Sequence, residues 1–127
     1  TLAAKVEKQE KVSFLDTVFA YKVLDVAARK GEPYDAEVQA FALGRDLAIV
    51  ALPGEVFVEL GLAIKKASPF KKTFVVTLAH GPVTYYPDRA AWQQGNYEVI
   101  TSRVAEGSGE KLVAAALRVL EKLTKAE

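Results

Sequence analysis

The sequence predicts an α/β fold (α+β is the alternative) in which a mixed β-sheet packs against about three to four helices. Short apolar, strand-like stretches alternate with longer helix-like stretches through the middle of the chain, which is typical of these classes. Half of the 127 residues are hydrophobic and 26% are charged, as expected for a globular protein with a real core. We therefore expect residues 1–127 to form a single domain or part of one, with residues 1–12 as a linker or helix end.

The charge balance and the residue types exclude several functional classes. Seventeen basic and 16 acidic residues give a net charge of +1, which argues against an electrostatically driven nucleic-acid binder. No apolar run is long enough to span a bilayer, so we expect no transmembrane segment. The N-terminus is too charged for a signal peptide. Because the chain has no cysteine, disulfides and thiolate zinc sites are excluded.

The first predicted element is a helix over residues 14–31. Ser13 is placed to cap its N-terminus, and Gly31 marks its end. Apolar side chains cover most of its circumference, so we expect this helix to be buried on more than one side.

Two strands are predicted to follow as a hairpin. Residues 36–43 alternate enough for a half-buried strand, and Gly44 and Arg45 suit a two-residue turn. The next strand, 46–52, is apolar on both faces and should lie centrally in a sheet. Pro53 and Gly54 end it.

The remaining elements are predicted from apolar spacing and from capping signals. We predict a helix over 55–68, a second central strand over 72–79, a loop over 80–88 with short extended pieces, a short helix that begins near Pro87, an extended segment over 97–101, and a final helix capped by Ser108. The final helix carries one apolar stripe, formed by Leu112, Val113, Ala116, Leu117, Leu120 and Leu123.

Polar groups collect where the predicted strands end. Glu55 follows strand 46–52, His80 follows strand 72–79, and Tyr85 and Tyr86 lie in the loop beyond. Ligands of α/β proteins gather at the carboxyl ends of strands, so these groups are candidates for one site. Each also has a simpler reading. A glutamate in a first helical turn is favoured by the helix dipole, a loop histidine is usually solvated, and tyrosines usually pack with the hydroxyl at the surface.

The chain contains no complete active site of a familiar kind. A single histidine and no cysteine cannot complete a usual zinc site. No glycine-flanked serine accompanies His80, and there is no phosphate-binding glycine loop. The Gly-Ser-Gly run at 107–109 is either an anion-binding helix start or a simple turn and cap.

Several strings together carry a family resemblance. They are "LAIVALPGEVFVELG" at 47–61, "SPFKKTFVVTLAHG" at 68–81, "YYPD" at 85–88, "GNYE" at 95–98 and "GSGEKLV" at 107–113. With them the chain resembles the neutral/alkaline (non-lysosomal) ceramidase family, and more closely the bacterial ceramidase-like proteins. The resemblance runs from about Phe14 to Leu123. It corresponds to the C-terminal portion of that family's larger catalytic domain.

The resemblance implies a function and a set of site residues. Members of the family are zinc-dependent hydrolases of the amide bond of N-acylsphingosines, secreted, periplasmic or at the membrane surface. Their Zn²⁺ is held by two histidines from an earlier part of the chain, by the glutamate of a Pro-Gly-Glu motif and by a tyrosine after the next strand. In this sequence the last two correspond to Glu55 and Tyr85, so the metal is completed by two histidines outside this chain. A second tyrosine, here Tyr97, hydrogen-bonds the reacting carbonyl.

The resemblance also implies which partners the chain has and which rival functions remain. The partners are the remainder of the parent catalytic domain and an N-acyl lipid, and the chain alone is expected to be inactive. His80 stands where the family has asparagine, and Asp88 and Tyr86 also depart from its pattern. His80 is therefore a candidate additional ligand, or a residue that supports the ligands. The rivals are a non-catalytic α/β binding or assembly module and a small independent enzyme that uses His80 as its base.

Overall fold

The computed structural model describes residues 4, 8, 13–81 and 84–125, and the chain divides into two compact units. The first unit is Thr1–Tyr34 and the second is Asp35–Glu127. The predicted linker or helix end over residues 1–12 lies almost entirely outside the described residues.

The first unit contains helix α2, Phe14–Ala28. The Ser13 hydroxyl accepts a hydrogen bond from the Asp16 N–H at 3.1 Å, so the predicted helix and its cap are confirmed. The helix ends before Gly31. The prediction that it is buried on several sides is wrong for this chain, because Ala20 is its only buried residue.

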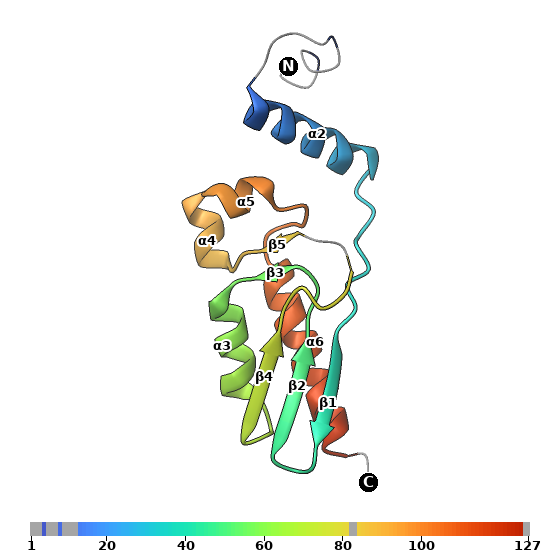
Figure 1. Ribbon diagram of the computed structural model, residues 1–127, viewed down its shortest axis with the longest axis vertical. Coiled ribbons are helices and arrows are strands. Elements are labelled where there is room, and N and C mark those ends of the chain that lie inside the picture. Colours follow the sequence, from blue (N-terminus) through green and yellow to red (C-terminus); the bar gives the residue numbers. More distant parts are fainter. Residues whose placement is uncertain (1–3, 5–7, 9–12, 82–83, 126–127) are drawn as a thin grey trace. The chain divides into compact units, whose positions relative to one another are not determined.

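The second unit is built around a three-stranded mixed sheet, which confirms the predicted fold class (Figure 1). Its strands are β1 (Gln39–Leu43), β2 (Leu47–Ala51) and β4 (Lys72–Val76), in the order β1-β2-β4. β1 runs antiparallel to β2, and β4 runs parallel to it. The apolar strand β2 is central, as its sequence predicts.

Two details of the sheet correct the sequence predictions. The hairpin turn has three residues, 44–46, because Leu43 pairs with Leu47. Asp46 therefore belongs to the turn, where its carboxylate pairs with Lys71 at 3.0 Å. β4 was expected to be central, but within the described part of the chain it forms an edge of the sheet.

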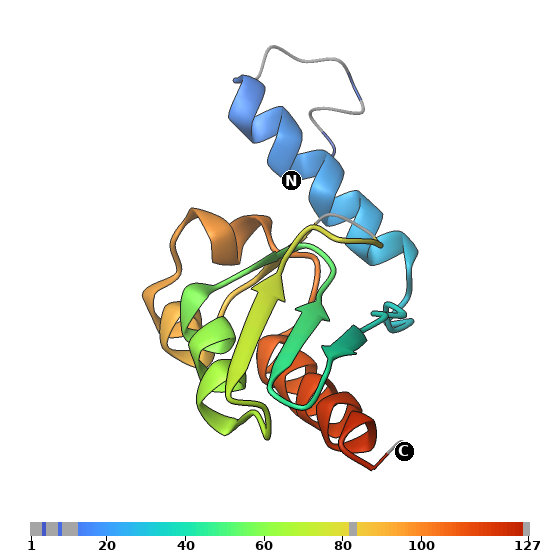
Figure 2. The ribbon, with the colours of Figure 1, turned by 60° about the horizontal axis from the view of Figure 1, so that its bottom comes forward.

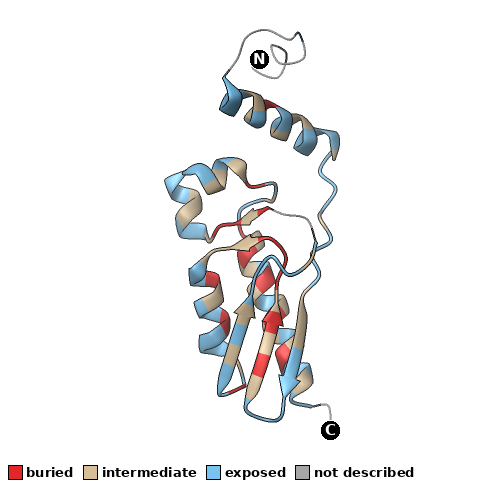
Figure 3. Cartoon of the chain, viewed as in Figure 1, coloured by how far each residue is buried: buried red, intermediate tan, exposed pale blue. Residues whose placement is uncertain are grey.

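Helices α3 (Val58–Ala67) and α6 (Ser108–Leu123) cover one face of this sheet (Figure 2). The predicted apolar stripe of α6 is confirmed, although Gly107 rather than Ser108 takes the cap position. Buried residues concentrate on β2, on the turn after it and on the covering helices (Figure 3). The main core cluster contains Ala48, Val50, Leu52, Ile64, Phe70, Ala116 and Leu120. Full burial of each large aliphatic side chain contributes about 1.5–3 kcal/mol.

The remaining elements are short and lie beyond one end of the sheet, where β2 and β4 end (Figure 1). Strands β3 (Glu55–Val56) and β5 (Tyr85–Tyr86) pair with each other, and helices α4 (Arg89–Gln94) and α5 (Tyr97–Thr101) follow. The predicted short helix after Pro87 is confirmed, with Asp88 as its cap. None of the five helices, α2 to α6, among the described residues is both long and apolar enough to cross a bilayer.

Two predictions about these short elements are wrong. Residues 97–101 were expected to be extended but form α5, whose first turn is closed by hydrogen bonds from the Val99 and Ile100 N–H groups to the Asn96 carbonyl. The helix predicted to start at Glu55 starts instead at Val58. Because Glu55 lies in a strand, the helix-dipole explanation of this residue is wrong as well.

Candidate functional site

Strands β3 and β5 form a two-stranded parallel sheet in which Glu55 is aligned with Tyr85. The Glu55 N–H donates to the Thr84 carbonyl at 2.8 Å, and the Phe57 N–H donates to the Tyr86 carbonyl at 3.2 Å. Side chains alternate along a strand, so those of Glu55 and Tyr85 lie on one face. On the other face, Tyr86 is buried in a second core cluster.

The chain enters β3 through a tight turn at Gly54. Gly54 has a φ of +65°, a backbone conformation that residues other than glycine rarely adopt. A Cβ atom here would overlap the Thr84 carbonyl oxygen and come within 2.8 Å of the Tyr86 ring. The glycine therefore lets β3 approach β5 closely enough for Glu55 and Tyr85 to meet.

The Glu55 carboxylate acts directly on the phenol of Tyr85. Partial burial raises the pKa of Tyr85 most, and the negative charge of Glu55 together with a side-chain hydrogen bond between the two raises it further. Weaker contributions come from Tyr97 and Glu98. The phenol of Tyr85 therefore keeps its proton to a higher pH than an ordinary tyrosine.

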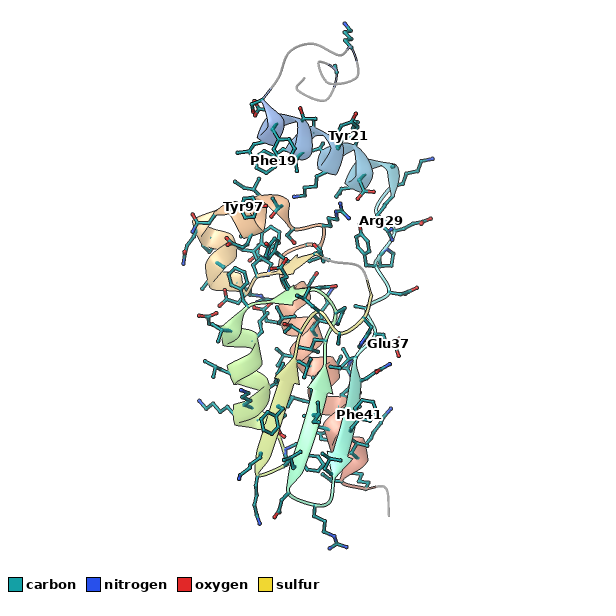
Figure 4. The ribbon with its side chains drawn as sticks, in the orientation of Figure 1. Phe19, Tyr21, Arg29, Glu37, Phe41 and Tyr97 are labelled. Carbon is teal, nitrogen blue, oxygen red and sulfur yellow. The ribbon has the colours of Figure 1, made fainter. Side chains whose placement is uncertain are left out.

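Tyr97 joins this pair from the start of α5 (Figure 4). Its ring meets the Tyr85 ring edge-on, with centroids 6.0 Å apart and an interplanar angle of 73°. The residue that ends α5, Ser102, is buried, and its hydroxyl donates to the Tyr85 carbonyl at 2.9 Å. A bond from the Arg103 N–H to the Thr84 hydroxyl, at 2.9 Å, adds a second tie between the two segments. Glu55, Tyr85 and Tyr97 are therefore brought together, with Tyr97 still 53% exposed.

His80 is engaged elsewhere. Its Nε2–H donates to the backbone carbonyl of Glu37 at 2.8 Å, which ties the loop after β4 to the segment before β1. This bond fixes Nε2 as the protonated nitrogen. A role for His80 beside a metal stays a prediction.

Sequence reasoning missed Glu98 and the two hydroxyls that tie the site together. The negative charge of Glu98 also raises the pKa of Tyr85, by less than that of Glu55 does. Its only sequence signal is its place next to Tyr97 in the Tyr-Glu pair. Thr84 and Ser102 are buried polar residues, and nothing in the local sequence marks either as a tie between β5 and α5.

The donors present suit part of a zinc shell. Among the described residues, no three histidine, cysteine, aspartate or glutamate side chains gather into a metal-sized group. Among the described residues Glu55 takes part in no ion pair, so no cationic side chain neutralises it there. A carboxylate and a phenol on one face provide two oxygen donors, and a tetrahedral zinc site needs further ligands from elsewhere.

A shallow apolar groove of about 150 Å³ begins where β3 ends. It runs between α3 and the edge strand β4, and Lys65 is its one charged lining residue. The lining residues are Val56, Phe57, Val58, Gly61, Leu62, Lys65, Val75 and Thr77. The groove is thus continuous along the chain with the strand that carries Glu55.

Comparison of this chain with protein-family models, with curated proteins and with solved structures finds no match. The ceramidase resemblance therefore depends on its motifs alone, and the functional assignment that follows is a proposal.

Proposed function

We propose that this chain is the C-terminal segment of a zinc-dependent amidohydrolase that resembles neutral ceramidase. In this proposal the rest of the parent catalytic domain contributes two histidines, and the segment alone is inactive. The observation that carries the proposal is the pairing of Glu55 with Tyr85 across β3 and β5, with the Tyr97 ring against the Tyr85 ring. These are the three residues that the family motifs single out.

Each of the three side chains has a distinct role in the proposal. Glu55 and Tyr85 would hold the metal through their carboxylate and phenol groups, on strands whose backbones are hydrogen-bonded to each other. Bound Zn²⁺ supplies Lewis-acid polarisation of an amide carbonyl and a water of lowered pKa. Tyr97, half-exposed beside this pair, is placed to donate its O–H to the oxyanion that develops on the substrate.

The groove beside β3 supports an N-acyl lipid as the substrate class. Val56 and Phe57, which directly follow Glu55, line its start, and the exposed Leu62 lines its outer wall. Apolar walls of this kind suit a hydrocarbon chain, because burial of each CH₂ group contributes about 0.8 kcal/mol. The scissile amide would then lie at the Glu55 end.

A second candidate is a non-catalytic α/β module that serves binding or assembly. The exposed apolar side chains on the uncovered face of the main sheet favour it, because such patches commonly mark interaction sites. The two candidates differ in what precedes this segment. Two histidines at the ends of earlier strands of the parent protein favour the hydrolase, and their absence favours the module.

The hydrolase proposal is tested by Tyr97→Phe in the longer protein that carries this segment. We expect roughly 100- to 1000-fold slower hydrolysis of an N-acylsphingosine with unchanged zinc content, since loss of one oxyanion donor costs about 2.7–4 kcal/mol. The matched control is Tyr21→Phe, a tyrosine of similar exposure in the first unit, which should leave turnover unchanged. Equal turnover in wild type and Tyr97→Phe contradicts the role given to Tyr97.

A further inference from the structure

The face of the main sheet that α3 and α6 leave uncovered is almost entirely apolar. Phe41, Ile49 and Phe74 are aligned across the three strands and form its middle row. Phe41 and Phe74 are each 56% exposed, and Leu43 and Val76 are exposed beside them. A continuous apolar surface of this kind is unusual on a monomer and marks an interaction site.

Two opposite charges lie at diagonal corners of this face. Glu37 lies just before edge strand β1 (Figure 4). Its carboxylate accepts a hydrogen bond at 2.8 Å from the side chain of Gln39, which shares a face with Phe41 because side chains alternate along a strand. Lys72 begins β4 on the other edge strand. Because β1 and β4 run in opposite directions, the two strand starts lie at opposite ends of the sheet.

Neither corner charge is neutralised within the described chain. The ion pair beside Lys72 joins Lys71 to Asp46 and leaves Lys72 out. The face thus presents an apolar centre, one unpaired carboxylate and, diagonally opposite, one unpaired ammonium. A surface with this pattern is complementary to itself.

We propose that this sheet face is a homodimer interface in which a second copy packs face to face through a two-fold axis. The axis lies parallel to the sheet and perpendicular to the line that joins Glu37 to Lys72. Each Lys72 then meets Glu37 of the other copy, and the two Phe41–Ile49–Phe74 rows cross.

This inference is independent of the proposed hydrolase function. The Glu55, Tyr85 and Tyr97 side chains belong to the smaller β3–β5 sheet and to α5, and none of the three lies on the dimer face. Loss of hydrolysis therefore leaves the dimer proposal standing, and loss of self-association leaves the hydrolase proposal standing.

The apolar part of the interface is tested by sedimentation equilibrium of the full 127-residue chain. We expect a concentration-dependent dimer, and we expect Phe41→Glu to raise the dissociation constant roughly tenfold or more, since it places a charge at the desolvated centre. The matched control is Leu62→Glu. Leu62 has the same 56% exposure but lies on α3, off the sheet face, so dimerisation should be unchanged.

The proposed pairing of Glu37 with Lys72 of the other copy is tested by exchanging the two charges. Glu37→Lys and Lys72→Glu should each weaken the dimer roughly tenfold, because two attractive pairs become repulsive. The double variant Glu37→Lys/Lys72→Glu should return the dissociation constant to near the wild-type value.

Three results would each overturn the proposal. The first is a wild-type chain that stays monomeric, and the second is a loss of dimer in Leu62→Glu but not in Phe41→Glu. The third is a double variant that dimerises no more tightly than the single variants. Circular dichroism of each variant checks that it is folded.

Discussion

The phenol of Tyr85 holds its proton to a higher pH than an ordinary tyrosine, because partial burial and the Glu55 carboxylate both disfavour its ionised form. The same two side chains are those that the family resemblance assigns to a metal. A cation between them would reverse the balance, since it favours phenolate and carboxylate together. The pKa of Tyr85 is therefore a measure of the interaction between Glu55 and Tyr85.

At this scale we predict that Glu55→Gln lowers the pKa of Tyr85 toward the ordinary value of 10.0 while leaving it somewhat raised by burial. Ring-carbon NMR titration of the tyrosines, with Tyr85→Phe to assign the signal, measures this directly. Glu59→Gln is the control, because Glu59 is an exposed carboxylate in the first turn of α3. An identical Tyr85 titration in wild type and Glu55→Gln contradicts the contact.

The same shift has a consequence for stability. The native state retains the Tyr85 proton between pH 10.0 and its higher native pKa, whereas the unfolded chain has released it. The contribution of this group is thus fully present below about pH 10 and is lost as the pH rises through the native pKa. The alkaline loss of stability should be smaller in Glu55→Gln. Urea unfolding of both proteins at a series of alkaline pH values measures this difference.

Among the elements, the long periodic ones could be predicted from sequence and the short ones could not. The stripe of α6 and the apolar run of β2 are local patterns, and both predict their elements correctly. The two-residue strand β3 depends on β5, a partner far along the chain, and no local pattern reveals that pairing. Helix α5 contains β-branched residues that favour a strand, but the turn closed on Asn96 overrides that preference.

The residues of the candidate site could be picked out from the sequence, but their arrangement in space could not. The motif resemblance picks out Glu55, Tyr85 and Tyr97, and the structure brings them together. Their convergence depends on long-range pairing and on the buried hydroxyls of Thr84 and Ser102, which sequence periodicity cannot detect.

The turn into β3 gives the prediction at the scale of elements. Gly54→Ala should destabilise the chain by about 3 kcal/mol, because it adds a clash with Thr84 and Tyr86 to the cost of a left-handed alanine. Gly95→Ala is the matched control. Gly95 has the same φ of +65° but nothing within 4 Å of its Cβ position, so the cost should be about 1 kcal/mol. Equal unfolding midpoints in urea for the two variants would show that β3 and β5 are not closely packed.

On the scale of the whole molecule, two surfaces of the second unit lack partners within the described chain. The Glu55–Tyr85–Tyr97 cluster provides oxygen donors without the nitrogen ligands that zinc usually takes in proteins. The uncovered sheet face provides an apolar centre with opposite charges at its corners. Our two proposals give these surfaces different occupants: the parent catalytic domain for the cluster and a second copy for the sheet face.

Zinc content of the proposed parent protein tests the central claim most directly. We predict about one zinc ion per wild-type chain by mass spectrometry of the purified protein, a strong loss in Glu55→Gln, and full retention in the neighbouring control Glu59→Gln. A Glu55→Gln protein that keeps the wild-type zinc content would contradict the account, because the carboxylate at the start of β3 would then not be a metal ligand.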